Sequence, residues 1–88
     1  MKYELRTDKR FDKAFKSLDR PVQKTIKAWI ENNLMDCEDP RRNGKALSGN
    51  LKGIWRYRIG NYRLLCKIED KKLIIFALNI GHRREIYK

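Results

Sequence analysis

The chain has 88 residues, and its 22 lysines and arginines against 11 aspartates and glutamates give a formal net charge of +11. This length leaves room for one domain, residues 1–88, with one core, and an apolar share of 41% argues against a disordered chain. The positive excess favours a polyanionic partner: nucleic acid first, an anionic membrane second and an acidic protein third.

No apolar stretch approaches the roughly 18 residues of a membrane-spanning helix, and the start of the chain, Met1–Glu4, does not have the pattern of a signal peptide. We therefore expect a soluble, cytoplasmic protein without a membrane partner. The two cysteines, Cys37 and Cys66, have no metal-binding spacing. We expect both to be free thiols in a reducing compartment.

The first third of the chain predicts a strand followed by two helices. Lys2–Arg6 alternates, with Tyr3 and Leu5 on one face, as a short strand does. Asp8 and Asp19 stand where N-caps are expected. The apolar stripes of the two helices are Phe11, Ala14, Phe15 and Leu18, and then Val22, Ile26, Trp29, Ile30 and Asn33 or Leu34. Because the connection is very short, the helices should form an antiparallel hairpin.

The rest of the chain predicts an irregular region and three strands. Residues 35–50 are rich in turn-forming pairs and are expected to be irregular. The strands follow at about Ile54–Ile59, Tyr62–Ile68 and Lys72–Ile80. The predicted order is βααβββ. This is an α+β fold with a helical hairpin packed on one face of a mostly antiparallel four-stranded sheet.

A two-residue turn at Gly60-Asn61 fixes the register of the first strand pair and places Arg58 opposite Arg63. One face of this pair then carries apolar residues, whereas the other carries Arg56, Arg58, Arg63 and Lys67, with Leu65 as its one apolar member. Like charges opposite each other destabilise a strand pair. The cluster therefore favours a docking site for a polyanion, although a solvated basic face remains the alternative.

A similar turn at Asp70-Lys71 would place Leu78 opposite Arg63 and bring the closing segment, Gly81–Tyr87, to the same end of the sheet. This segment includes His82, the only histidine. A solvated turn residue or hydrogen-bonded anchor is the favoured interpretation of His82, ahead of a catalytic base. No second histidine or cysteine cluster complements it, so no metal site is expected.

Three stretches together resemble the RelE toxins of the RelE/ParE superfamily. They are Lys45–Gly49, Gly53–Leu64 and Gly81–Tyr87. The resemblance implies a toxin of a type II toxin–antitoxin system. Such a toxin enters the ribosomal A site and cuts messenger RNA, and a RelB-like antitoxin silences it. No cofactor or metal is implied.

The resemblance also implies the site residues. Arg56, Arg58 and Arg63 match the basic positions of the strand pair, and Arg83 and Tyr87 match the basic and aromatic residues of the C-terminal segment. Further contacts to RNA or the ribosome are expected from Lys52, Lys67, Arg84 and Lys88. Relatives can carry a lysine as the proposed general base where this chain has arginine, which stays protonated. The identity of the general base is therefore open, and His82 and Glu85 are the remaining candidates.

The reaction implied is attack of an RNA 2′-hydroxyl on the adjacent phosphate, which gives a 2′,3′-cyclic phosphate without a metal. Two alternatives remain. A ParE-like toxin would share the fold and poison DNA gyrase without cutting RNA. A non-catalytic nucleic-acid-binding module would use the net charge for salt-sensitive binding without turnover.

Overall fold

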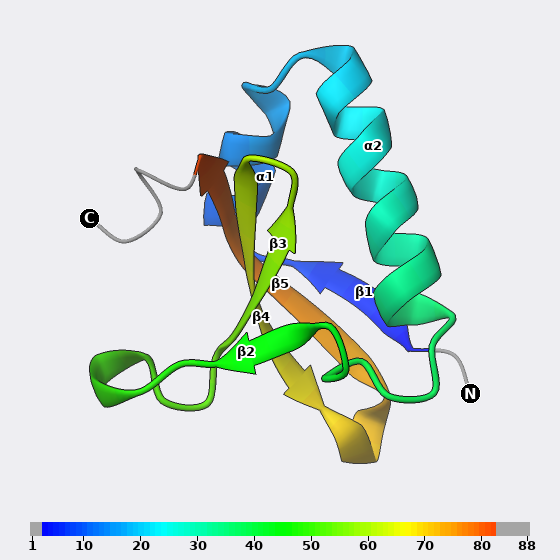
Figure 1. Cartoon of the computed structure of the whole chain (residues 1–88), viewed down its shortest axis with the longest axis vertical. Coiled ribbons are helices and arrows are strands. Elements are labelled where there is room, and N and C mark those ends of the chain that lie inside the picture. Colours follow the sequence, from blue (N-terminus) through cyan, green and yellow to red (C-terminus); the bar gives the residue numbers. More distant parts are fainter. Residues whose placement is uncertain (1–2, 83–88) are drawn as a thin grey trace.

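The computed structural model describes residues 3–82 and contains two helices beside one sheet. The elements are β1 (Glu4–Thr7), α1 (Lys9–Lys16), α2 (Arg20–Ile30), β2 (Gly44–Ala46), β3 (Trp55–Ile59), β4 (Tyr62–Glu69) and β5 (Ile74–His82). The strand order is β1-β5-β4-β3-β2, with β1 and β5 parallel and the other pairs antiparallel (Figure 1). The predicted α+β class is confirmed.

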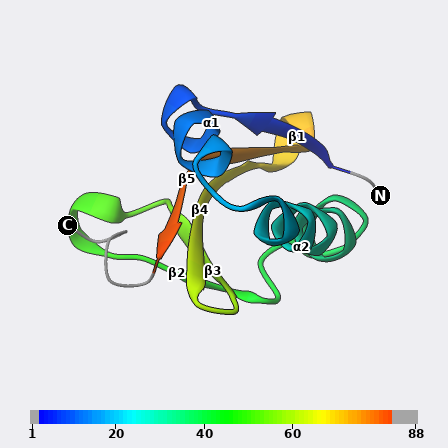
Figure 2. The same cartoon turned by 90° about the horizontal axis from the view of Figure 1, so that it is seen from above.

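The sheet has five strands instead of the predicted four. The extra strand is β2, which lies inside the region predicted to be irregular and pairs with β3 over three residues. So short a strand carries no readable alternation of polar and apolar residues. Beyond β2 the chain leaves the sheet and returns to β3 through a 3-10 turn at Gly49–Leu51. We call residues 47–54 the arm. It extends on the side of the sheet away from α2 (Figure 2).

Both helices begin where the sequence predicts, but not through the predicted caps. Asp8 and Asp19 occupy the N-cap positions, and neither carboxylate makes a capping hydrogen bond. Gln23 holds the hairpin instead, because its side-chain amide donates to the carbonyl oxygens of Phe15 (3.0 Å) and Leu18 (2.8 Å). Phe15 lies in the last turn of α1 and Leu18 lies just after the helix, where helical hydrogen-bond partners run out. α2 continues into a π-helical turn, Glu31–Met35.

The core lies between the helices and one face of the sheet. α1 contributes Phe11, and the ring of Trp29 on α2 packs edge-on against Tyr57 of β3, with centroids 5.7 Å apart. The buried core residues of helix, turn and sheet are Tyr3, Phe11, Ile26, Ile30, Leu34, Tyr57, Ile59, Leu64, Cys66, Ile75, Ala77 and Ile80. We call this face of the sheet the inner face and the opposite one the outer face. Cys37 and Cys66 are free thiols, as predicted.

The register of β3 and β4 is the predicted one. Ile59 pairs with Tyr62 across the turn, Arg58 pairs with Arg63, and Trp55 pairs with Cys66. Gly60 adopts a positive φ of 59°, a conformation that glycine tolerates in a tight hairpin turn. The burial of the inner-face residues Tyr57, Leu64 and Cys66 agrees with the predicted alternation.

The register of β4 and β5 differs from the prediction, which placed Leu78 opposite Arg63. The residue opposite Arg63 is Gly81. The connection is longer than two residues, since a 3-10 turn at Asp70–Lys72 is followed by Leu73 in the left-handed conformation with φ 53°. A bulge between Leu65 and Cys66 then shifts the register by one further residue.

A network of side chains ties the loop before β2 to the sheet. The guanidinium of Arg41 donates two hydrogen bonds to the carboxylate of Asp70, at 2.9 and 2.8 Å, and lies over the Trp55 ring at 5.6 Å. Tyr3 donates its hydroxyl to the same carboxylate at 3.2 Å. One residue before Arg41, the carbonyl of Pro40 accepts a hydrogen bond from the hydroxyl of Tyr57. The loop before β2 is therefore anchored to β3 and to the turn after β4.

Candidate active site on the outer face of the sheet

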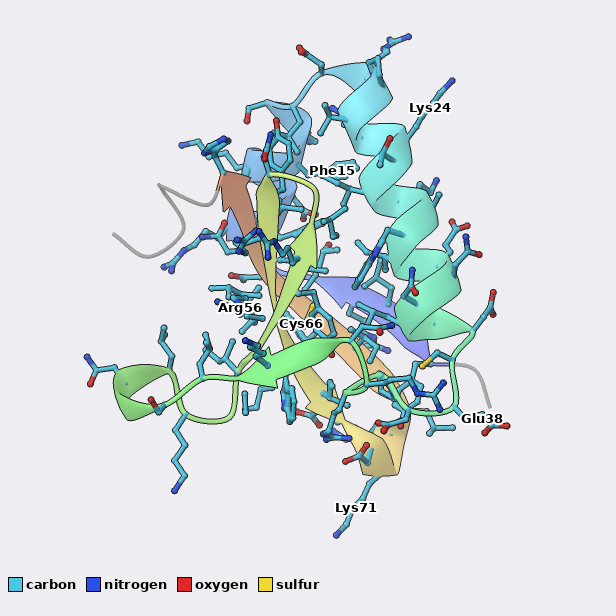
Figure 3. All side chains as sticks on the ribbon, viewed as in Figure 1. Phe15, Lys24, Glu38, Arg56, Cys66 and Lys71 are labelled. Atoms are coloured by element: carbon cyan, nitrogen blue, oxygen red, sulfur yellow. The ribbon has the colours of Figure 1, made fainter. Side chains whose placement is uncertain are left out.

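The outer face of the β3–β4 hairpin gathers the basic residues that the sequence singled out. Arg56 and Arg58 come from β3 and Arg63 from β4, and all three lie on the face away from the core. Their neighbour Leu65, opposite Arg56, completes this face. Arg56 lies in the angle between the hairpin and the segment that follows β2 (Figure 3). The alternation of β strands thus presents three guanidinium groups on one surface.

Arg58 and Arg63 are two positively charged residues that pair with each other across the hairpin. They occupy directly opposed positions on neighbouring strands, where side chains project side by side. Arg58 is exposed, whereas Arg63 is only 8% exposed and is the one buried charged residue within residues 3–82. Its Nη1 donates to the carbonyl oxygen of Tyr62 at 3.3 Å, and both Arg63 and Arg56 make further interactions. Arg63 is therefore held in place, while Arg58 faces solvent.

The C-terminal end of β5 lies beside this pair. Gly81 lies directly opposite Arg63, one residue before the end of the strand. The predicted arrival of the closing segment at the arginine end of the sheet is therefore observed up to residue 82. The remaining candidates of that segment fall outside the described residues: Arg83, Arg84, Glu85, Tyr87 and Lys88.

His82 is a strand residue, not a turn residue. It pairs with Tyr62 in the inner-face row, and the two rings meet edge to face with centroids 6.0 Å apart. The side chain is half-buried. The structure thus does not bring His82 together with Arg58 and Arg63, because it belongs to the other face of the sheet.

The two remaining lysine candidates lie at the borders of the outer face. Lys67 is exposed on β4 opposite Phe76 of β5. Lys52 is exposed on the arm, directly after the turn Gly49–Leu51. The structure therefore places Lys67 farther along the strand that carries Arg63, and Lys52 on the segment that extends from the sheet on the outer side.

Asn79 is a polar residue of the outer face that sequence reasoning missed. The predicted register put it opposite Tyr62, on the inner face, but the bulge places it opposite Leu65. Its Oδ1 accepts a hydrogen bond from the backbone N–H of Ile80 at 2.9 Å, which orients the amide. Sequence alone offered no signal, since neither the bulge nor the left-handed Leu73 has a local signature.

The inner face beneath the arginines is neutral. Burial raises the pKa of the Cys66 thiol, which is fully enclosed, and burial is also the first cause that raises the pKa of the Tyr57 phenol. Both groups therefore stay protonated at neutral pH. Within residues 3–82, no three histidine, cysteine, aspartate or glutamate side chains are placed to hold a metal ion together. No helix in that range is long and apolar enough to cross a membrane.

Comparison with known proteins agrees with this fold. Residues 5–87 match the family described as the ParE toxin of the type II toxin–antitoxin system. Over 50 residues the chain is 40% identical to Toxin RelG of Mycobacterium tuberculosis, a match covering 57% of this chain and 58% of RelG.

Two solved structures extend the likeness to nearly the whole chain. The RelBE2 toxin–antitoxin complex of M. tuberculosis matches with a TM-score of 0.85 and 26% identity, over 94% of this chain and 100% of that one. The isolated RelE toxin of E. coli matches with a TM-score of 0.73 and 26% identity, over 97% and 90%. The resemblance to RelE toxins is confirmed, and the chain belongs to the ParE toxin family of type II toxin–antitoxin systems, within the RelE/ParE superfamily.

Proposed function

We propose that this chain is a single-domain, cytoplasmic, ribosome-dependent endoribonuclease that cleaves messenger RNA in the ribosomal A site and so inhibits translation. The observation that carries the proposal is the pairing of Arg58 with Arg63 on the outer face, with Arg56 on the same face. Such a pair destabilises the hairpin but suits a phosphate, whose oxygens accept hydrogen bonds from the guanidinium fork.

The proposed reaction needs no metal. The 2′-oxygen of a ribose forms a bond to the adjacent phosphorus, and the bond from phosphorus to the 5′-oxygen of the next nucleotide breaks. A base accepts the 2′-hydroxyl proton, and an acid donates a proton to the leaving 5′-oxygen. The products are a 2′,3′-cyclic phosphate and a 5′-hydroxyl end. Negative charge on the phosphate oxygens grows in the transition state, so fixed cations there accelerate the step.

The residues divide among these tasks. We assign charge stabilisation to Arg58, Arg63 and Arg83. Arg56 would hold the RNA backbone near the 2′-hydroxyl, and Tyr87 would stack on a base or orient the phosphate. Arg83 and Tyr87 enter this proposal through the resemblance alone.

Glu85 and His82 are the candidate acid and base. His82 lies in the inner-face row with Tyr62, which leaves Glu85 as the first choice for a proton acceptor. Lys52, Lys67, Arg84 and Lys88 are proposed contacts to messenger or ribosomal RNA, because each carries a positive charge.

The proposed protein partner is a RelB-like antitoxin. Several similar structures contain such a partner, among them the RelBE2 complex of M. tuberculosis and an E. coli RelE variant bound to a peptide of the antitoxin RelB, at 27% identity to this chain. A net charge of +11 favours an antitoxin segment with complementary acidity. Although the family is named after ParE, the similar structures include RelE and RelBE proteins, so we do not favour a gyrase inhibitor of the ParE kind.

The test is induction of the chain with and without a co-expressed cognate antitoxin, followed by mapping of the 5′ ends of a translated message. Cleavage within codons, relieved by the antitoxin, is the expected result. Arg63→Ala should lower the cleavage rate by about 10²–10³, the typical cost of losing one charge-stabilising donor. Arg10→Ala is the matched control, because Arg10 is an exposed arginine on α1 and does not belong to the β3–β4 hairpin.

Each alternative predicts a different outcome. DNA breaks and an SOS response without new messenger ends would show a gyrase poison. Binding to RNA without cleavage would show a non-catalytic module. A fully toxic Arg63→Ala variant would remove Arg63 from the reaction.

A further inference from the structure

The side chain of Arg41, in the loop before β2, joins two distant parts of the sheet. Its guanidinium donates two hydrogen bonds to the carboxylate of Asp70, in the turn after β4. The same guanidinium lies over the ring of Trp55, the first residue of β3. β2 begins at Gly44, three residues after Arg41. The arm therefore leaves the sheet from the strand that follows Arg41 and returns to it at the residue that Arg41 covers (Figure 1).

The backbone of Arg41 is held as firmly as its side chain. The Oδ1 atom of Asp39 accepts a hydrogen bond from the Arg41 N–H at 3.1 Å, and the Arg41 carbonyl accepts one from the N–H of Gly44, also at 3.1 Å. Gly44 in turn lies so close to the ring of Tyr57 that an added Cβ would come within 2.7 Å of it. The guanidinium is thus presented to Trp55 from a fixed loop, which reduces the conformational freedom that the contact must overcome.

The exposure of the ion pair indicates a role in geometry more than in stability. The side chains of Arg41 and Asp70 are 33% and 57% exposed, and a solvated ion pair contributes only about 0–1 kcal/mol to the free energy of unfolding. A two-pronged bond to a carboxylate nevertheless fixes the orientation of a guanidinium. Because the guanidinium also lies over the Trp55 ring at 5.6 Å, the pair contributes more to the position of Trp55 than to stability.

The start of β3 has little other support on its β2 side. β2 is the last strand of the sheet and pairs with β3 over only three residues. The chain enters β3 directly from the arm, whose residues 48–50 are exposed. Segments with few buried contacts open locally at a low cost in free energy. Arg56 is the second residue of β3 and lies on the outer face (Figure 3), so its position depends on how Trp55 is held.

We propose that Arg41 is a positioning residue for RNA cleavage: by holding Trp55 it fixes the start of β3, and with it the place of the Arg56 guanidinium. This inference rests on the proposed function, in which Arg56 holds the RNA backbone near the 2′-hydroxyl. Arg41 acts through Arg56 and does not itself contact the RNA, because its guanidinium is already bound to Asp70 and Trp55. A displacement of about 1 Å in groups that orient a substrate costs about 10² in rate.

The test compares substitutions at two neighbouring arginines. Arg41→Gln removes the guanidinium from Asp70 and Trp55. Arg42→Gln is the matched control, because it removes the same charge from the next residue, which is exposed. Arg41→Lys keeps the charge and loses the planar fork. Cleavage of a translated message is measured on purified ribosomes, at a temperature where thermal unfolding shows the wild type and all variants to be folded.

Arg41→Gln should lower kcat by about 10–100-fold, as expected for a misplaced orienting group. KM for ribosomes should stay within about twofold of the wild-type value, because the interaction that is lost acts in the transition state. Arg41→Lys should lose most of the same activity, since a lysine cannot bind Asp70 with two prongs and cover Trp55 at once. Arg42→Gln should keep kcat within about twofold of wild type.

Two further measurements separate positioning from a loss of structure. In a Trp29→Phe background Trp55 is the only tryptophan, and acrylamide should quench its fluorescence more strongly in Arg41→Gln than in Arg42→Gln, because the ring is uncovered. In an Arg56→Gln background, measured in single-turnover reactions with toxin in excess, Arg41→Gln should cost less than about threefold, because the group that it positions is gone. A merely structural loss would give the same factor with and without Arg56.

Three results overturn the inference: equal kcat for Arg41→Gln and Arg42→Gln, full activity of Arg41→Lys, or an equal loss in the presence and absence of Arg56. The second would show that the charge of Arg41 matters and its geometry does not. Failure of the proposed function looks different. The wild type would then leave the messenger intact, and the positioning role would fall with the reaction, whereas the fluorescence would still report whether Arg41 covers Trp55.

Discussion

The two faces of the β3–β4 hairpin are built from alternate residues of the same ten or so positions, yet they behave in opposite ways. The inner face buries Tyr57, Leu64 and Cys66 completely. The outer face sets Arg58 against Arg63. One face supplies apolar burial, which stabilises folding, and the other places like charges where they repel. Because side chains alternate along the strands, one face of the hairpin stabilises the fold and the other carries the candidate catalytic residues.

Substitutions on the two faces should therefore have different effects. Substitutions of the buried inner-face residues should lower the free energy of unfolding, and substitution of the exposed outer-face residue Arg58 should lower activity without lowering stability.

The largest effect on stability is expected from Leu64→Ala. Leu64 is fully buried beneath the arginine face, and truncation of such a side chain leaves a cavity that costs about 2–5 kcal/mol. Denaturant unfolding measures this loss. Lys67→Ala, an exposed residue of the same strand, should change the free energy of unfolding by less than about 0.5 kcal/mol. Similar losses for both variants would contradict the division of β4 into a buried position at Leu64 and a solvent-exposed one at Lys67.

Arg58→Gln should do the reverse. Removing one of two opposed charges relieves repulsion and should stabilise the hairpin by about 0.2–1 kcal/mol, while messenger cleavage falls by about 10²–10³ if Arg58 stabilises the transition state. Denaturant unfolding and 5′-end mapping of the same protein measure the two effects. A variant that is both less stable and less active would point to a structural role for Arg58.

Gly44→Ala tests whether the two faces are coupled through β2. A Cβ at this position would lie 2.7 Å from a carbon of the Tyr57 ring, and Tyr57 sits between Arg56 and Arg58 in β3. Overpacking of this kind costs about 1–3 kcal/mol, and displacement of Tyr57 should also reduce cleavage. Lys45→Ala, at the next and exposed position, is the control for denaturant unfolding and cleavage. Full activity in a destabilised Gly44→Ala protein would show that the faces are independent.

The sequence predicted one hairpin and failed on the next for a physical reason. Gly60-Asn61 is a turn whose glycine supports a positive φ, so the pairing of Arg58 with Arg63 followed from local chemistry. The β4–β5 connection instead relies on Leu73 in the left-handed conformation, without a glycine, and on a bulge at Leu65/Cys66. Both are set by tertiary packing, which overrides local preference.

The candidate site divides in the same way. Its β3 and β4 arginines were predictable from the turn and the alternation of side chains, whereas Asn79 was not singled out, and the bulge that puts it on the outer face was not predicted. The hydrogen-bonded ion pair between Arg41 and Asp70 joins residues that are 29 positions apart. No sequence pattern in either segment predicts it. Contacts of this kind form only in the assembled sheet. The strands of the site can therefore be predicted from the sequence, whereas the long-range contacts that support them cannot.

The smallest effect is expected from Asp70→Asn, which tests those supports. The hydrogen bonds from Arg41 are the first cause that lowers the pKa of the Asp70 carboxyl. Because the folded-state pKa lies below the unfolded one, the contribution to stability is present above the ordinary carboxyl range and is lost as pH falls through the lowered pKa. Asp70→Asn should therefore lower the Tm slightly at pH 7, and the gap to wild type should close in acid. Thermal unfolding across pH measures this gap. A gap that persists in acid would mean that the shape of Asp70, and not its charge, holds the loop that carries Arg41 against Trp55.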